Sequence, residues 1–330
     1  MTITSPAPPE TRLSTVLPAR VLGWGMHVPE PIVTNSDLEK TLDTSDTWIV
    51  ERSGIRQRHR VGPGDTTASM AIRAGRAALD RAGVPADRVD LVVLATTTED
   101  RVCPATAATV QDELGTRGAA FDLNAACSGF VYALHTGAAL LRTPGIEHVL
   151  VIGSDRFAAY ADPQDRTTAV LFGDGAGAVL LAASDDPTGP GILGVDLGGD
   201  GSAVEILGIR DREAFVHMDG REVFRRATRG IVDSCTAALE RAGATPDDVD
   251  VFVPHQANLR IIEAAAHRLG LPMDKVVVNI DRYGNTSAGS IPIALSEAAD
   301  DGRLDDGTTV LACGIGAGMS WASALLRWGR

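Results

Sequence analysis

The sequence of 330 residues has few aromatic side chains, few cysteines and no long apolar run. Aromatics make up 4% of the chain, so its core must be filled mainly by small aliphatic side chains. No stretch reaches the roughly 18 apolar residues of a membrane-spanning helix, which argues against a membrane protein. The four cysteines form no C-x-x-C pair, so the usual zinc spacing is missing and we expect no metal site.

Basic residues are also in deficit, with 30 Lys and Arg against 43 Asp and Glu, for a formal net charge of −13. Such a surface argues against nucleic acid as a general partner, because phosphate binding needs a basic face. Residues 1–17 are polar and Pro-rich, without the basic-then-apolar order of a signal peptide, and they predict a flexible tail. Together with the free thiols, this favours a cytoplasmic protein.

What the chain does contain is an internal repeat. Segments 77–97 and 237–257 share ten of 21 positions, and segment 127–134 aligns with 288–295. Gly-rich motifs at 173–177 and 314–318 suggest a third match. The repeat predicts two duplicated halves, residues 18–187 and 188–330.

Each half alternates helical patterns with apolar runs typical of strands buried on both faces. The expected strands are Val89–Thr96, His148–Gly153, Val249–Val253 and Thr308–Cys313. This alternation predicts layered α/β architecture. Polar residues at the strand ends are therefore the first candidates for chemistry.

Cys127 follows such a strand and begins an amphipathic run, Val131 to Leu141. A thiol at a helix N-terminus meets the positive end of the helix dipole, which predicts a lowered pKa and a nucleophilic thiolate. The alternative is an inert buried cysteine, the interpretation we favour for Cys103, Cys235 and Cys313.

His255 follows the strand Val249–Val253, where the first half has Ala95, and it is the candidate partner of the nucleophile. Asn285 lies in a Gly-Asn loop before the helix that repeats the Cys127 helix. A histidine satisfied within the core and an ordinary Gly-Asn turn are the respective alternatives. The glycine motifs lack both G-x-G-x-x-G and P-loop spacing, so nucleotide binding is not expected.

Three motifs carry a resemblance: Ala-Cys127-Ser-Gly-Phe, Pro-His255-Gln-Ala-Asn and Gly-Asn285-Thr-Ser-Ala. They resemble the active-site signatures of β-ketoacyl-ACP synthase III, a condensing enzyme of the thiolase superfamily, and the likeness runs from about Ala19 to Trp328. It implies a thiolase-like, five-layered αβαβα fold built from the two halves, and a homodimer.

The resemblance also implies a function: decarboxylative Claisen condensation that starts a fatty acid or polyketide chain. Cys127 would be acylated by acyl-CoA, while His255 and Asn285 would stabilise the enolate from malonyl-ACP. The backbone N–H groups of Cys127 and Ala317 would form a second oxyanion hole. No cofactor is implied, because decarboxylation itself supplies the carbanion.

Further contacts follow only from the resemblance. Trp48, Arg52 and Arg166 match CoA-side positions, and Phe224 matches a residue beside the pantetheine tunnel. An acidic carrier protein would dock on Arg225, Arg260 and Arg268. Cys103 occupies the acyl-pocket position where acetyl-specific relatives have Phe, which predicts a starter larger than acetyl.

Two departures and two alternatives accompany the resemblance. The tail motif reads Ile315-Gly-Ala-Gly318 rather than Phe-Gly-Gly-Gly, and Cys313 is one residue out of register with the basic cysteine of a degradative thiolase. One alternative is a thiolase-fold acyltransferase that moves an acyl group to an alcohol or amine without decarboxylation. The other is a non-catalytic partner subunit, against which the intact Cys127 argues.

Overall fold

The computed structural model describes residues 17–211 and 214–330. The predicted N-terminal tail, residues 1–17, lies outside this part of the chain except for Leu17, with which strand β1 begins. Among the described helices, none combines the length and apolarity that crossing a bilayer requires.

Nine of the described strands form a central sheet in the order β11-β12-β13-β8-β1-β7-β6-β4-β5. The first-half elements are β1 (Leu17–His27), α3 (Thr67–Ala82), β4 (Leu91–Ala95), α4 (Thr106–Leu114), β5 (Ala119–Leu123), α5 (Gly129–Leu140), β6 (His148–Arg156) and β7 (Asp174–Ala183). The second-half elements are β8 (Gly191–Gly198), α6 (Gly220–Ala242), β11 (Val251–Pro254), α7 (Leu259–Leu269), α9 (Ser290–Asp300), β12 (Thr309–Ile315) and β13 (Trp321–Arg327).

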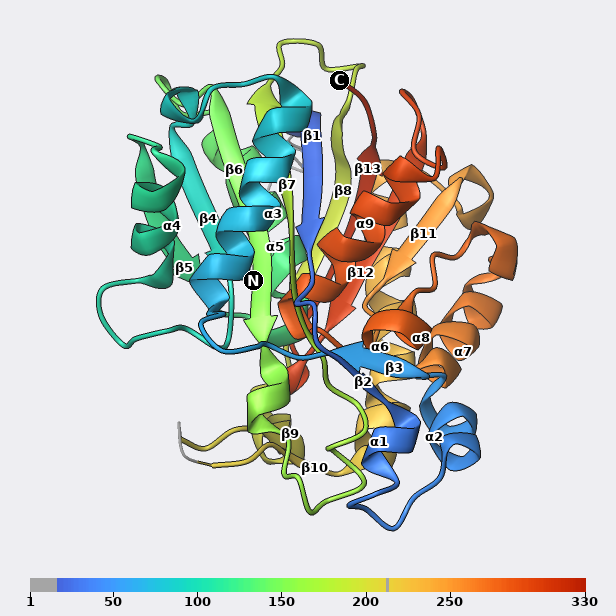
Figure 1. The fold of residues 1–330 in the computed structure, drawn as a ribbon. Coiled ribbons are helices and arrows are strands. Elements are labelled where there is room, and N and C mark those ends of the chain that lie inside the picture. The colour runs from blue at the N-terminus through green and yellow to red at the C-terminus, as the bar shows by residue number, and fades with distance from the viewer. Residues whose placement is uncertain (1–16, 212–213) are drawn as a thin grey trace, which may run out of the picture.

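The two parts of this sheet mirror each other. The order β1-β7-β6-β4 in the first half corresponds to β8-β13-β12-β11 in the second, and β1 meets β8 only at the pairs Leu17–Ile192 and Pro18–Gly191. Helices α5 and α9 contact strands of both halves, while α3 with α4 and α6 with α7 cover the outer faces. Each part of the sheet therefore forms one layer, with α5 and α9 between the two parts. With the outer helices this gives five layers, helix-sheet-helix-sheet-helix (Figure 1).

Small residues let the layers approach closely. A Cβ on Gly23 of β1 would lie 2.2 Å from the Ala78 carbonyl oxygen of α3, and one on Gly194 of β8 would lie 2.2 Å from that of Ala238 in α6. The same close helix–strand contact thus occurs in both halves. It explains why a chain with so few aromatics is rich in Gly and Ala.

The four predicted strands are confirmed as β4, β6, β11 and β12, with ends that differ by a few residues. The match proposed between the two Gly-rich motifs is wrong. Segment 173–177 opens β7, whereas 314–318 runs from the end of β12 into the 3-10 helix η8 (Ala317–Met319). Similar small-residue composition arises there at two non-equivalent places.

Shorter elements gather at one end of the sheet, below it in Figure 1. They are β2 (Ile32–Thr34), α1 (Asn35–Leu38), α2 (Asp46–Ser53), β3 (Gln57–His59), the 3-10 helix η4 (Gly201–Ile206), β9 (Leu207–Gly208), β10 (His217–Met218) and α8 (Ile280–Tyr283). Residues from several of these elements line a large cavity together with the ends of the central strands.

Candidate active site

This cavity of about 1220 Å³ brings together the three residues that the strand ends predicted. Cys127, His255 and Asn285 all line it, the first from the front half and the other two from the back half. Each side chain is at most 8% exposed. A sulfur, an imidazole and an amide therefore share one enclosed space.

Cys127 is presented by a tight turn between β5 and α5. Ala126 adopts a left-handed φ of 50°, and the 3-10 helix η2 (Ala126–Ser128) then leads into α5. The end of β12 passes directly behind the cysteine, where a Cβ on Gly316 would lie 2.6 Å from the Cys127 backbone nitrogen. Glycine is required here because any side chain would collide with the backbone of the candidate nucleophile.

Burial raises the pKa of the Cys127 thiol to about 12, and the nearby Asp155 carboxylate adds to this, while a hydrogen bond to Ser287 opposes it. The lowered pKa expected from the helix start is therefore wrong for this state of the site. Loss of water around the sulfur and the Asp155 charge together raise the pKa by more than the hydrogen bonds lower it. The thiol is the resting form.

His255 stands directly after β11 and is held by its backbone. Its N–H donates to the Cys313 carbonyl over 2.7 Å. The next residue, Gln256, accepts the N–H groups of Asn279 and Ile280 and donates to the carbonyls of Pro254 and Val277. Gln256 thus fastens the loop that orients the imidazole.

The imidazole itself is free to meet a substrate. Neither ring nitrogen of His255 has a hydrogen-bond partner among the described residues, although the side chain is only 2% exposed. Burial lowers its pKa to about 3, so the ring is neutral near pH 7. A neutral imidazole offers one N–H donor and one acceptor nitrogen to the cavity.

Asn285 is anchored on both sides of its peptide. Its N–H donates to the Leu171 carbonyl, and its own carbonyl accepts the Gly173 N–H. The side-chain Oδ1 accepts the N–H of Ser287 over 2.9 Å. Since Oδ1 is occupied in this way, the amide N–H group is left to face the cavity.

The turn around Asn285 is a structural copy of the turn before Cys127. At a spacing of 161 residues, Asn124 corresponds to Asn285 and Ala126 to Ser287. The Oδ1 of Asn124 accepts the Ala126 N–H, and φ is 50° at Ala126 and 49° at Ser287. Sequence reasoning paired the helices but missed Asn124 and Ser287, which extending the same alignment by a few residues would have found.

Of the other predicted site residues, some line the cavity and some do not. Ala317, Trp48, Arg52 and Phe224 line the cavity. Arg166 does not, but its guanidinium lies 5.1 Å from the centre of the Trp48 ring. Ala317 begins η8 and Cys127 lies in the first turn of η2, where backbone N–H groups have no partner within the helix.

Three arginines predicted to dock a carrier lie outside the cavity lining. Arg225 is ion-paired with Glu222 over 2.7 Å, whereas Arg260 stacks 5.6 Å from the centre of the Phe224 ring. Arg268 lies in the last turn of α7. Cys103 is exposed on a loop, so the expectation of a buried cysteine is wrong for it. It does not line the cavity of its own chain, so its assignment to an acyl pocket requires a second copy and stays a prediction.

Across residues 17–211 and 214–330, no group of three or more His, Cys, Asp or Glu is placed to hold a metal ion. Cys313 is fully buried and does not line the cavity, which agrees with a structural role for it.

A buried cysteine at a helix start shares one cavity with a histidine and an asparagine from the other half of a duplicated, five-layered α/β fold. This is the arrangement of a condensing enzyme of the thiolase fold. Comparison with known proteins narrows this class. The family model described as 3-oxoacyl-[acyl-carrier-protein] synthase III matches residues 121–201, and its C-terminal counterpart matches residues 239–328. The chain belongs to the β-ketoacyl-[acyl-carrier-protein] synthase III family.

Individual relatives agree over nearly the whole chain. The β-ketoacyl-[acyl-carrier-protein] synthase III of Roseiflexus sp. is 48% identical over 325 residues, covering 94% of this chain and 98% of the relative. The crystal structure of the Aquifex aeolicus enzyme superposes with a TM-score of 0.91 at 42% identity, covering 94% of this chain and all of that one. The priming β-ketosynthase of the R1128 polyketide pathway gives 0.88 at 38% identity, covering 97% and 99%.

Proposed function

We propose that this protein joins an acyl group from acyl-CoA to malonyl-ACP by decarboxylative Claisen condensation and so starts a fatty acid or polyketide chain. The observation that carries the proposal is the shared cavity of Cys127, His255 and Asn285, in which the imidazole is neutral and both of its nitrogens are unpaired. Membership of the synthase III family supports the same reaction.

In the first step, the Cys127 sulfur attacks the thioester carbonyl of acyl-CoA. Because the thiol is protonated at rest, its proton must leave as the S–C bond forms, and the basic nitrogen of the neutral His255 is the acceptor in the same cavity. The backbone N–H groups of Cys127 and Ala317 stabilise the tetrahedral oxyanion. The C–S bond to CoA then breaks, and the CoA thiolate departs with the proton.

In the second step, malonyl-ACP occupies the vacated space. Its carboxylate leaves as CO₂, and the electron pair moves into an enolate. The N–H donors of His255 and Asn285 hold the thioester oxygen on which the charge develops. The carbanion then attacks the acyl-cysteine carbonyl, so a C–C bond forms, the bond to Cys127 sulfur breaks and the thiol is regained by protonation.

Decarboxylation supplies the carbanion, so the reaction needs neutral donors rather than a strong base, and we propose no metal or redox cofactor for it. Trp48, Arg52 and Arg166 would bind the nucleotide end of CoA at the cavity mouth. Phe224 would flank the pantetheine arm. These roles rest on the family resemblance and on the positions of the side chains.

We also propose a carrier-protein site and a homodimer, again from the family resemblance and the side-chain positions. Arg225, Arg260 and Arg268 give a local basic surface on an acidic chain, which suits an acidic carrier protein. A homodimer would bring Cys103 of one copy to the acyl pocket of the other, and its small side chain would admit a starter larger than acetyl.

The test is a reaction of purified protein with several acyl-CoAs and malonyl-ACP, followed by mass analysis of enzyme and carrier. We expect an acyl adduct on Cys127, release of CO₂ and a β-ketoacyl-carrier product. An adduct without CO₂ release would instead establish simple acyl transfer to another acceptor. No adduct with any acyl-CoA would overturn the enzymatic proposal.

A further inference from the structure

Asp155 is a buried carboxylate beside the proposed catalytic groups that the mechanism above does not use. It lies near the end of β6, is 0% exposed and does not line the cavity. A buried acid away from substrate requires compensation for its lost hydration, and the source of that compensation indicates what it holds in place.

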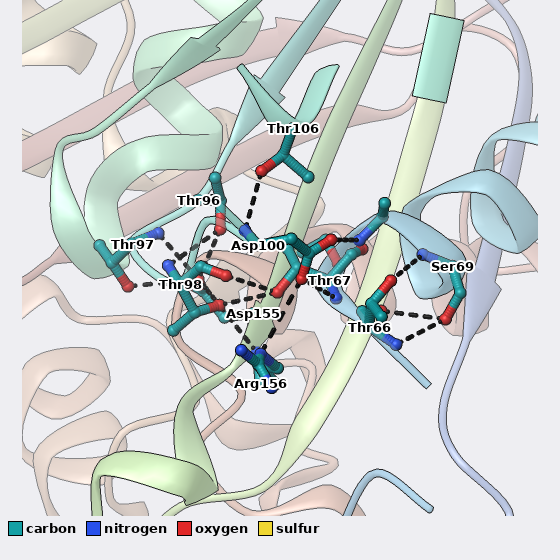
Figure 2. A network of polar contacts seen from close by, with 12 residues as sticks. Thr66, Thr67, Ser69, Thr96, Thr97, Thr98, Asp100, Thr106, Asp155 and Arg156 are labelled. Atoms are coloured by element: carbon teal, nitrogen blue, oxygen red, sulfur yellow. Dashed lines mark hydrogen bonds and ion pairs between the residues drawn. The ribbon is translucent and has the colours of Figure 1, made fainter. Parts of the chain in front are cut away.

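One oxygen of Asp155 is held by the loop after β4. Its Oδ1 accepts the hydroxyls of Thr96, Thr97 and Thr98 and the N–H of Thr97, at 2.8 to 3.2 Å (Figure 2). The Thr96 hydroxyl oxygen accepts the Thr98 N–H, and that of Thr98 accepts the Arg156 N–H. Their hydroxyl protons are therefore directed to Asp155. Burial raises the pKa of this carboxyl, and these hydrogen bonds oppose the rise by stabilising its charged form.

The other oxygen reaches across to the back half. Oδ2 accepts the N–H of Ala288 over 3.0 Å, and the Ser287 hydroxyl also hydrogen-bonds this carboxylate. Ser287 is the residue whose N–H orients the Asn285 amide, and its hydroxyl oxygen lies 3.6 Å from the Cys127 sulfur. Asp155 thus contacts the one turn that touches both the proposed nucleophile and the proposed oxyanion donor.

The duplication shows that this contact is particular to one half. Ala288 corresponds to Cys127 at a spacing of 161, and Asp155 corresponds to Gly316. Asp155 binds the Ala288 N–H, whereas Gly316 brings no side chain to the Cys127 N–H and leaves it for an oxyanion. The back-half N–H is used for support and the front-half N–H is left for chemistry.

We propose that Asp155 is a positioning residue of this active site: its carboxylate holds the turn 285–288 against Cys127 and thereby aims the Asn285 amide into the cavity. The proposal rests on the function proposed above. Asp155 also exerts a second effect, because its negative charge beside the sulfur disfavours the thiolate. It is the charged group that acts on the buried thiol, since His255 is neutral.

These two effects make opposite predictions for Asp155→Asn, which is nearly isosteric. An amide cannot accept from all of the same donors, so the turn shifts and we expect condensation with malonyl-ACP to fall about 10- to 100-fold, as for other supporting contacts in active sites. With the charge removed, alkylation of Cys127 by iodoacetamide at pH 7 becomes at least about threefold faster, and its pH profile moves to lower pH.

Asp122→Asn is the matched control. Asp122 also accepts two backbone N–H groups, from Thr106 and Ala107 at 2.7 Å each, but it does not line the cavity or contact the Asn285 turn. Both assays should stay at the wild-type level. Equal slowing of alkylation and condensation in Asp155→Asn, with no shift of the alkylation profile, would reduce Asp155 to a structural role and overturn the proposal.

Ser287→Ala tests the positioning role of Asp155 if Asp155→Asn fails to fold. Alanine accepts the required backbone, since Ala126 has the same φ in the front half. Loss of the hydroxyl removes one contact to the Asp155 carboxylate and keeps the contact from the Ala288 N–H, so condensation should fall, but by less than tenfold. Wild-type condensation in Ser287→Ala would contradict the network. A wild-type protein that releases no CO₂ would refute the proposed function, whereas the alkylation assay would still test Asp155.

Discussion

The turns at 124–129 and 285–290 have the same backbone conformation but different proposed roles in the reaction. Both begin with an asparagine whose Oδ1 accepts the N–H two residues on, and both pass through a left-handed residue into a central helix. In the front half the following residue is Cys127, and in the back half it is Ala288. The comparison shows how a duplicated element can supply the nucleophile in one copy and the supporting contacts for its partners in the other.

Removal of the front-half group should have the largest effect. Cys127→Ala leaves no sulfur to acylate, so we expect acyl-enzyme formation to vanish and condensation to fall more than about 10⁴-fold. The donors for the enolate remain, so CO₂ release from malonyl-ACP should persist. Intact-protein mass spectrometry measures acylation, and a CO₂ assay measures decarboxylation. Loss of both activities together would mean that decarboxylation also depends on the front-half cysteine.

The reciprocal variants test the back half. His255→Ala and Asn285→Ala each remove a donor to the developing enolate, and we expect decarboxylation to fall about 10²- to 10³-fold. Asn285→Ala should leave the acylation of Cys127 within a few-fold of wild type. A comparable loss in its acylation rate would show that Asn285 serves the first step as well.

Gly316→Ala probes the position that corresponds to Asp155. The added Cβ would lie 2.6 Å from the Cys127 nitrogen, so the nucleophile must shift and we expect acylation to slow about 10- to 100-fold. Gly201→Ala is the control, because a Cβ there meets nothing within 4 Å. Stopped-flow measurement of acyl-enzyme formation compares them. Equal rates for the two variants would show that the close packing of Gly316 on Cys127 does not position the nucleophile.

Most of this comparison was accessible from the sequence. The apolar runs gave the central strands, and strand-end polarity with the repeat singled out Cys127, His255 and Asn285. Asp155 carries no such local signal, because its significance depends on Ala288, 133 residues away. The direction of the Cys127 pKa was missed for a related reason: dehydration of the sulfur follows from closure of both halves around it, whereas the helix start is visible locally.

The halves also differ in that the back half has His255 where the front half has Ala95. This buried histidine makes the free energy of unfolding depend on pH. The unfolded chain binds a proton at this histidine below pH 6.5, while the native ring stays neutral down to about pH 3. Stability is therefore lost as the pH falls through this window. Between pH 7 and 5, wild type should lose about 2 kcal/mol more free energy of unfolding than His255→Gln.

Urea denaturation of both proteins at the two pH values measures this difference. The other histidines are common to both proteins and cancel in the comparison. Parallel losses of stability in wild type and His255→Gln would mean that the buried imidazole is protonated in the native state, and the neutral donor in the proposed mechanism would then be wrong.

The smallest expected effects concern carrier docking, for which all the proposed residues lie in the back half. Arg225 is already paired with Glu222, whereas Arg260 has no carboxylate within 4.0 Å among the described residues and stacks on the Phe224 ring at the cavity wall. We therefore expect Arg260→Glu to raise the KM for malonyl-ACP about tenfold and Arg225→Glu only about threefold. Acylation by acyl-CoA should be unchanged in Arg225→Glu, which lies outside the cavity wall.

Arg142→Glu, at an exposed arginine that follows α5 in the front half, makes the same charge change away from the proposed surface. Its KM for malonyl-ACP should stay within about twofold of wild type, because a uniform change in net charge acts weakly at a distance and is screened by salt. Added salt should narrow the gap between Arg260→Glu and wild type, since the lost attraction is electrostatic. Equal KM increases in all three variants would show that the carrier senses overall charge, and the division of labour between the halves would then end at the cavity and not extend to the surface.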